Sequence, residues 1–267
     1  MSAQREVYPR APLRLVVAEL RYPYAPRLAS SEAVERLTTM FRPIFPLPEP
    51  TGMQVVMALG GTSQTQSSPS AVNRFLARDR TSSVTVSPQN IVIETTVYSE
   101  YEKFRPLLET CLGALGEIEG AIVGLERVGL RYINEIRVPA LRNHTEWSTF
   151  LASPLIASLA LIPNRDVALT QSVVQTEPRE NVTTLVRYGA LRGQVVSAAG
   201  PLQVAALPPT SPFFLLDIDN SWSSHQSYDE YSVQSALDIC DRLHGPIDEL
   251  FESAITDDLR EVFRRTE

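Results

Sequence analysis

The chain has 267 residues, 43% of them hydrophobic and 21% charged, and its formal net charge is −7. This composition is typical of a folded globular protein with a sizeable core. No apolar run reaches the roughly 20 residues that a membrane span needs, and the first ten residues contain no apolar signal core. We therefore expect a cytoplasmic protein without membrane contact. The acidic charge also disfavours nucleic acid as a partner, because phosphate binding needs clustered positive charge.

The first half of the chain alternates between strand and helix patterns. An apolar strand-like run is followed by a helix that Ser30-Ser31-Glu32 opens, and the second helix is expected to begin near Arg105-Pro106, where proline fits a first turn. Between the helices, Ser87-Pro88-Gln89-Asn90 predicts a tight turn between two strands. The predicted elements are strand 13–22, helix 30–44, strands 53–59, 73–79, 82–87 and 91–98, and a helix from 105 onward.

The second half shows the same order. A proline after Gly245 is expected to break the closing helix, and an apolar stripe then continues to Phe263. Residues 60–70 and 199–212 are rich in small, polar or proline residues and are expected to be loops. The predicted elements are strand 128–138, helix 146–161, strands 167–176, 182–191, 194–198 and 213–218, and a helix from 232 onward.

Short motifs recur in both halves at equivalent places. A Glu-x-Arg-x-Pro motif closes the first strand of each half, at 19–23 and at 135–139, and a Tyr-x-Glu-Tyr motif precedes the closing helix, which holds Cys111 in one half and Cys240 in the other. Tandem repetition predicts two similar units related by a pseudo-twofold axis. We expect the units to span residues 1–125 and 126–267. Both cysteines are expected to be buried rather than bonded to each other.

Each unit therefore reads strand, helix, four strands, helix. This order predicts an α+β fold in which an antiparallel sheet carries its helices on one face and leaves the other, here called the outer face, uncovered. The topology resembles the helix-grip units of the TATA-binding-protein-like fold, which also occur as a tandem pair.

Three sequence blocks carry a closer resemblance. They are residues 15–23, the Arg-Val-Gly-Leu-Arg-Tyr-Ile-Asn block at 127–134, and residues 243–256. In these blocks the chain is similar to a sporadically distributed family of bacterial and archaeal proteins. The resemblance implies a patchily inherited gene of the accessory or defence type, and it implies no particular activity.

Alternation along the two first strands predicts a shared set of charged residues on the outer face. If these strands meet at the pseudo-twofold axis, two Glu-x-Arg pairs lie together at the centre of the sheet. Arginine presents a planar fork to carboxylates or phosphates, so the set could bind a ligand or partner. The alternative is cross-strand ion pairing on a solvated sheet. The candidate residues are Glu19, Arg21, Arg131, Glu135 and Arg137.

Other polar residues receive structural interpretations. Asn134 falls on the core face, where we expect its amide to brace a loop or bulge. Asp217 and Asp219 follow an apolar run as in aspartate-based phosphotransfer enzymes, but the parallel sheet that such enzymes use is not predicted here. His244 is expected beside a helix end. The three histidines lack metal-site spacing, so we expect no metal and no cofactor.

These observations favour a non-catalytic binding or interaction protein that acts through the outer face or the C-terminal helix. Its partner would be another protein or a second copy of itself. One alternative is a sensor of a small anionic ligand or nucleotide, with a pocket around Arg21, Arg131 and Arg137. The other is an enzyme that uses Asp217 and Asp219, or a nucleic-acid binder.

Overall fold

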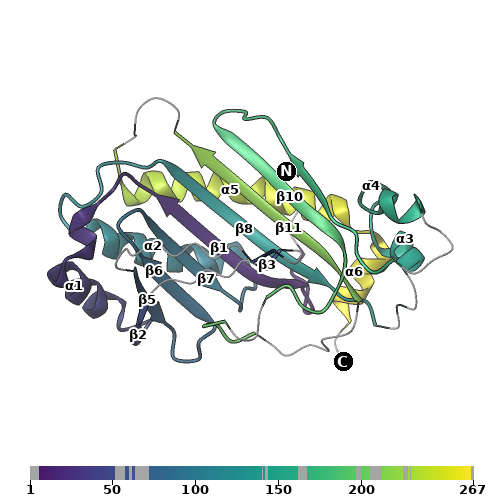
Figure 1. The fold of residues 1–267 in the computed structure, drawn as a ribbon, viewed down its shortest axis with the longest axis horizontal. Coiled ribbons are helices and arrows are strands. Elements are labelled where there is room, and N and C mark those ends of the chain that lie inside the picture. The colour runs from purple at the N-terminus through teal and green to yellow at the C-terminus, as the bar shows by residue number, and fades with distance from the viewer. Residues whose placement is uncertain are drawn as a thin grey trace.

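The computed structural model describes residues 6–51, 58–59, 62–63, 72–139, 141, 144–161, 167–196, 200–204, 212–224, 228 and 230–265. Within these ranges the fold is α+β, with one antiparallel sheet of nine strands, which confirms the predicted class (Figure 1). The strands of this sheet are β1 (Leu13–Arg21), β2 (Leu47–Thr51), β5 (Val72–Leu76), β6 (Ser82–Val86), β7 (Asn90–Thr95), β8 (Arg127–Ile136), β9 (Ser172–Gln175), β10 (Val182–Arg192) and β11 (Pro212–Ser223).

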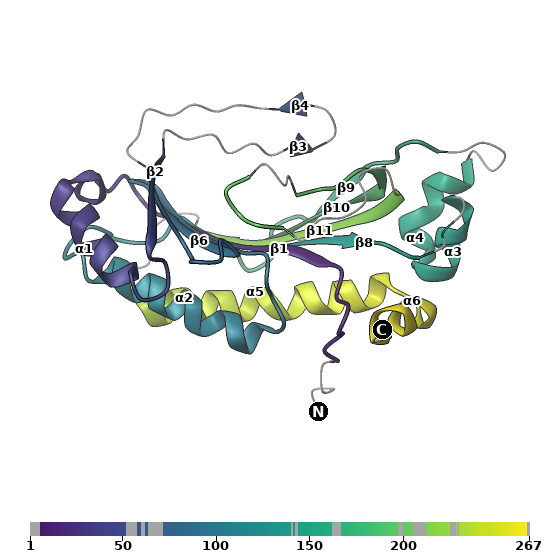
Figure 2. The same cartoon turned by 90° about the horizontal axis from the view of Figure 1, so that it is seen from below.

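The two halves of the chain form one continuous sheet, whose strand order is β2-β5-β6-β7-β1-β8-β11-β10-β9. The first strands of the two halves, β1 and β8, pair at its centre, with Val16 opposite Tyr132. A separate hairpin of β3 (Ala58–Leu59) and β4 (Thr62–Ser63) lies on the outer-face side of the sheet (Figure 2). The predicted boundary between the units falls in the connection that leads from the first closing helix to β8.

Two long helices, α2 (Tyr101–Gly116) and α5 (Val233–Ala254), lie on one face of this sheet, as predicted (Figure 2). Alternate residues of β1, among them Val16, Ala18 and Leu20, are fully buried beneath them in a single core that draws on both halves. Burial of each large apolar side chain contributes about 1.5–3 kcal/mol. The remaining helices are α1 (Ser31–Phe41), α3 (Trp147–Phe150), α4 (Ser153–Ile156) and α6 (Asp257–Arg264).

A reciprocal pair of tyrosines reflects the sequence repeat. Tyr231 donates its hydroxyl hydrogen to the carbonyl of Leu112 on α2, at 2.7 Å, and Tyr101 donates to Asp241 on α5, at 2.8 Å. Each tyrosine thus reaches the residue that follows the buried cysteine of the other unit, Cys111 or Cys240. The repeated motif therefore ties the two closing helices to each other.

Both closing helices continue through a proline, contrary to the sequence expectation. Helix α2 begins at Tyr101, four residues before the expected start, and includes Pro106, while α5 runs unbroken through Pro246. A proline inside a helix disturbs the hydrogen bonds of the preceding turn. In α5 the buried side chain of Asn220, on β11, donates to the carbonyl of Leu243 at 2.9 Å and so satisfies one group of that turn.

The second unit departs from the predicted element order in two further places. The helix expected at 146–161 is divided into α3, α4 and a 3-10 helix at Ala157–Leu161, and Pro154 lies at the start of α4. Residues 194–196, expected to begin a strand, are not in one. In the first unit the proline-rich segment after α1 forms edge strand β2, which the sequence did not predict. Most of the strand expected at 53–59 lies outside the described residues.

Candidate functional site

The charged residues predicted for the outer face do lie there. Glu19 and Arg21 on β1 form an ion pair at 2.9 Å, and Glu135 on β8 pairs with Arg137 just beyond the strand. Arg131 also projects from this face, where it bonds to Asp217 on β11. The alternation used to assign the faces is therefore confirmed.

The two Glu-x-Arg pairs do not meet at the centre, so that expectation was wrong. Because β1 and β8 are antiparallel, Glu19 lies opposite Gly129, whereas Glu135 lies beyond the opposite end of the pairing, next to Leu215 of β11. Six residues of β8 separate the two positions, a distance of roughly 20 Å. The same spacing prevents Arg21, Arg131 and Arg137 from lining one pocket.

An alternating row of charges crosses β1, β8, β11 and β10 in place of the predicted cluster. At the end of this row near the exposed Arg21, Arg127 donates to Glu19 at 2.8 Å and to Asp219 at 3.1 Å. We call this set of contacts the ion-pair row. Its members are Arg21, Glu19, Arg127, Asp219, Arg131, Asp217 and Arg187.

Gly129 makes room for the arginine that links the strands. The guanidinium of Arg127 lies over the Gly129 backbone, and a Cβ at Gly129 would come within 2.6 Å of Arg127 Nη1. The close approach brings this guanidinium to Glu19, which faces Gly129 across the β1–β8 pair. The glycine of the Arg-Val-Gly-Leu-Arg segment thus sets the position of the first arginine.

Asp217 is the most deeply buried member of the row, with a side chain only 1% exposed. Arg131 binds both of its oxygens at 2.7 Å, in a bidentate pair, and Arg187 on β10 adds a third contact at 3.3 Å. Bidentate arginine–carboxylate pairs are strong and geometrically specific. The Asp-x-Asp segment is therefore occupied by guanidinium groups from neighbouring strands.

Burial changes the protonation equilibria along the row. Burial raises the pKa of Asp219 above its usual range, although the nearby Arg127 and Arg131 oppose the change. For Arg131, burial lowers the pKa, but its hydrogen bond to Asp217 and the charge of that carboxylate outweigh burial and raise the pKa overall. The central arginine of the row is thus held in its charged form.

The end of the outer face near Glu135 is enclosed. The Glu135 side chain is 1% exposed, and besides Arg137 it accepts a hydrogen bond from the backbone of Val195 at 2.9 Å. Arg137 also donates to the carbonyl of Gly193 and lies over the ring of Phe213, 5.0 Å from its centroid. A small apolar cluster, formed by Ile133, Phe213 and Leu215, completes this end.

The connection between β10 and β11 extends this enclosure to the first unit. The backbone N–H of Gln203 donates to the carbonyl of Arg80 at 2.8 Å, and the hydroxyl of Thr96 donates to the carbonyl of Gln203 at 2.7 Å. Contacts with both units therefore hold this segment at one end of the strands. By contrast, Arg21 at the other end is 54% exposed.

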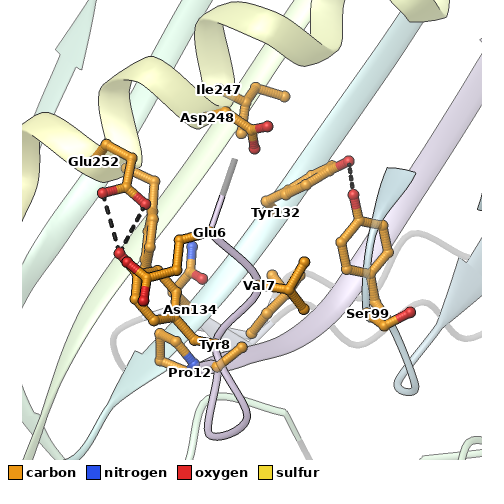
Figure 3. A pocket seen from close by; sticks show the side chains of 14 residues that line it. Glu6, Val7, Tyr8, Pro12, Ser99, Tyr132, Asn134, Ile247, Asp248 and Glu252 are labelled. Carbon is orange, nitrogen blue, oxygen red and sulfur yellow. Dashed lines mark hydrogen bonds between the residues drawn. The ribbon is translucent and has the colours of Figure 1, made fainter. Parts of the chain in front are cut away.

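A second candidate region is a small pocket on the helix side of the sheet (Figure 3). Its volume is about 50 Å³, enough for a few water molecules. Tyr8 donates to Glu252 on its wall, and the pKa of Tyr8 rises to about 12, mainly through burial and also through the charge of Glu252. The lining residues that carry polar groups include Glu6, Tyr8, Tyr98, Tyr132, Asp248 and Glu252.

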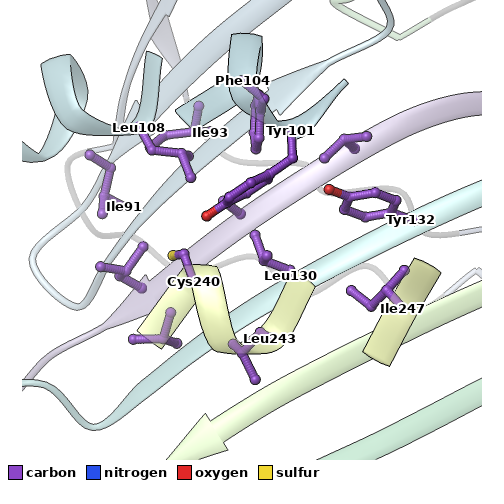
Figure 4. Packing of buried hydrophobic residues seen from close by; sticks show 14 of the residues in the cluster. Ile91, Ile93, Tyr101, Phe104, Leu108, Leu130, Tyr132, Cys240, Leu243 and Ile247 are labelled. Atoms are coloured by element: carbon purple, nitrogen blue, oxygen red, sulfur yellow. The ribbon is translucent and has the colours of Figure 1, made fainter. Parts of the chain in front are cut away.

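A chain of polar side chains runs from the pocket wall at Tyr98 through His244 and back to the wall at Asp248. The hydroxyls of Tyr98 and Tyr132 lie 2.8 Å apart, Tyr132 is 3.1 Å from His244 Nδ1, and His244 Nε2 is 3.1 Å from Asp248. Tyr101, which Figure 4 shows among buried hydrophobic residues, stacks on the imidazole of His244 with ring centroids 4.2 Å apart. His244 thus lies in the middle of α5 and not at a helix end, so its predicted role was wrong.

The other predicted positions have structural partners. Asn134 is buried and donates to the carbonyl of Leu216 at 3.0 Å, opposite the irregularity of β1 between Leu13 and Leu15. Cys111 and Cys240 are buried as predicted, and burial raises the pKa of Cys240 to about 12. The third histidine, His225, and most of the loop expected at 60–70 lie outside the described residues.

The described part of the chain contains neither a candidate metal site nor a candidate membrane span. No group of three or more His, Cys, Asp or Glu side chains there is arranged to hold a metal ion. No helix in the same ranges is long and apolar enough to span a membrane.

Comparison with known proteins gives no family assignment. No protein-family model matches the chain, and no curated protein matches it.

Proposed function

We propose that the protein is a non-catalytic binding protein, which engages a protein partner through the exposed end of the ion-pair row. The supporting observation is the alternation of charge from Arg21 through Glu19 and Arg127 to Asp219, at a place where Arg21 is half exposed. A surface that presents both signs of charge in a fixed order complements another protein surface with the opposite order.

The same contacts argue against an anionic small molecule or nucleic acid as the main ligand. Arg127 and Arg131 each bind a carboxylate of this chain, so a phosphate would have to displace an internal partner. Nucleic-acid affinity depends on arginines and lysines that neutralise phosphates, and here their charge is already balanced. An aspartate-based enzyme is also disfavoured, because Asp217 is buried under two arginines.

The accessory or defence-type role implied by the sequence resemblance is part of this proposal. A component that binds a partner without chemistry of its own fits such a role. The proposed binding residues are Glu19 and Arg21, together with Arg127 and Asp219, neither of which the sequence analysis assigned to a binding surface. Glu135 and Arg137 are left out because the β10–β11 connection encloses them.

The test begins with recovery of partners from the native host on immobilised protein, followed by measurement of direct binding to each purified partner. Arg21→Glu reverses the exposed charge, and we expect it to weaken binding at least about tenfold, because like charges would then face each other. Arg36→Glu is the matched control, since Arg36 is 52% exposed and pairs with Glu117 at 3.1 Å on another surface.

A second variant changes geometry without changing charge. Gly129→Ala adds a Cβ that displaces the Arg127 guanidinium from Glu19. We expect it to weaken the same partner while the fold persists, because the displaced group is the end of a flexible side chain. If both Arg21→Glu and Gly129→Ala bind every recovered partner as the wild type does, the proposal is wrong.

A further inference from the structure

The two outer edges of the nine-stranded sheet differ in their ability to pair. At one edge, β2 contains Pro48 and Pro50, which have no backbone N–H and therefore weaken strand pairing. At the other edge, β9 contains no proline, glycine or charged residue. Natural proteins usually protect an edge strand with such residues. The β9 edge is thus the one suited to accept another strand.

The register of β9 is fixed by its hairpin with β10. Glu180 and Asn181 form a two-residue turn with φ values of 52° and 66°, and Arg179 and Val182 exchange backbone hydrogen bonds across it. Two residues with positive φ are typical of the type I′ turn, which matches the twist of the flanking strands. Between this turn and the ladder, Glu177 and Pro178 lie opposite Thr183 alone, which is a bulge of one residue. The ladder beyond the bulge, with Val173 opposite Arg187, sets which groups of β9 face outward.

Outward-facing backbone groups follow from this register. The N–H groups of Thr170 and Thr176 donate to Ala190 and Thr184 on β10, at 2.9 and 3.0 Å. Antiparallel pairing alternates, so the N–H and C=O groups of Gln171, Val173 and Gln175 point away from β10. No hydrogen bond from the described residues reaches these outward groups.

The side chains along the same edge are apolar and accessible. Val173 is 59% exposed and Val174 is 51% exposed, and Leu169 just before the strand is exposed as well. The combination of exposed valines with unpaired backbone groups is the usual signature of strand addition.

From these features we infer that β9 pairs antiparallel with β9 of a second copy, about a twofold axis perpendicular to the sheet at Val173. Val173 then exchanges two hydrogen bonds with its counterpart, and Gln171 does so with Gln175 of the other copy. The sheets become continuous, with the helices of both copies on the same side.

The absence of charge along β9 suits pairing with a second copy, which is the occupant we propose. Residues 170–176 are uncharged, so the proposed pairing brings no like charges into opposition, although each chain carries a net charge of −7. The first acid beyond the strand, Glu177, would lie opposite Leu169. Because the β2 edge is blocked, pairing at β9 closes the assembly at two copies and does not propagate.

This assembly is independent of the partner site on the outer face, and it is tested by the oligomeric state of the full chain. Sedimentation velocity over a wide concentration range should show a monomer–dimer equilibrium. Val173→Lys and Val173→Glu should each raise the dissociation constant more than about tenfold, because the twofold axis places identical charges opposite each other. Val123→Lys, at another exposed valine, is the control and should not change it.

Mixing the two charged variants provides the decisive measurement. A Val173→Lys copy and a Val173→Glu copy place opposite charges at the axis, so their mixture should form a heterodimer, which native mass spectrometry resolves by mass when one of the two copies is uniformly ¹⁵N-labelled. A second readout needs no variant: amide exchange of a peptide covering residues 171–177 should slow as wild-type concentration rises. A wild type that stays monomeric, a Val173→Lys variant that dimerises normally, or a charged mixture that does not pair would overturn the inference.

Discussion

The side-chain amide of Asn220 donates a hydrogen bond to the carbonyl of Leu243, and this bond joins β11 to the turn of α5 that precedes Pro246. Asn220 is 1% exposed, and its side-chain oxygen accepts from Thr184 at 3.0 Å. The buried amide of Asn220 thus supplies a hydrogen bond to a turn of α5 whose backbone bonds Pro246 disturbs. Loss of the Asn220 side chain should therefore lower the free energy of unfolding.

We expect Asn220→Ala to lower the free energy of unfolding by about 1–3 kcal/mol, because the Leu243 carbonyl would be left buried without this donor. The cost should be smaller in a Pro246→Ala background, because without the proline this turn can become regular and the Ile247 N–H can donate to the Leu243 carbonyl. Urea denaturation of the two single variants and the double variant measures this coupling. Strictly additive effects would show that Asn220 does not compensate for the proline.

Arg21 and Arg137 belong to the same sequence motif but should differ in their effect on stability. Arg21→Ala should cost at most about 1 kcal/mol, since the Arg21–Glu19 pair is exposed on one side. Arg137→Ala should cost about 3 kcal/mol, because the buried Glu135 would lose its salt bridge, for which the charge of Arg14 and the Val195 N–H compensate only in part. Thermal and urea unfolding would measure both, and equal small losses would contradict the enclosed environment of Glu135.

Asp217→Asn should destabilise the fold more than Asp219→Asn does. The first change removes the carboxylate that neutralises two partly buried arginines, Arg131 and Arg187, and a cost of about 3–5 kcal/mol is expected. Asp219 is more exposed, and its salt bridge is to Arg127. Denaturant unfolding of both variants tests the order, and a neutral Asp217→Asn would show that the central pair contributes little.

Tyr8 should make stability depend on pH in the alkaline range. Its pKa is raised from 10.0 to about 12 in the folded protein, mainly by burial, so the folded state retains this proton longer than the unfolded state. The stabilisation is fully present below pH 10 and is lost as pH rises toward 12. The difference in unfolding free energy between the wild type and Tyr8→Phe should therefore fall over that interval, and a constant difference would refute the assignment.

Local patterns predicted much of this fold because they depend on near neighbours. Alternation in residues 128–138 assigned both faces of β8, and Ser30 caps α1 by accepting from the Ala33 N–H at 3.2 Å. Local patterns did not predict that the prolines of β2 and α5 lie inside a strand and a helix. Their effect depends on distant residues such as Asn220, which no local pattern relates to Pro246.

For the candidate site, local patterns predicted the face on which each residue lies but not its partner on a neighbouring strand. Residue type and parity identified Glu19, Arg21 and Arg131 on the outer face, but the pairing register of β8 with β11 determines that Arg131 meets Asp217. The alternation of Phe213, Leu215, Asp217 and Asp219 would have placed both acids on the same face, had it been compared with that of β8. The separation of the two Glu-x-Arg motifs required the antiparallel register of β1 with β8.

The central position of β1 and β8 also constrains the order of folding. β1 is synthesised early, yet the partner on one of its sides lies more than a hundred residues later, with Val16 opposite Tyr132. Long-range pairings close slowly because chain entropy must be lost first. Until β8 leaves the ribosome, that side of β1 remains an unpaired strand edge, which nascent chains on neighbouring ribosomes could reach. The nascent first half would thus be the stage at which this protein most needs a chaperone.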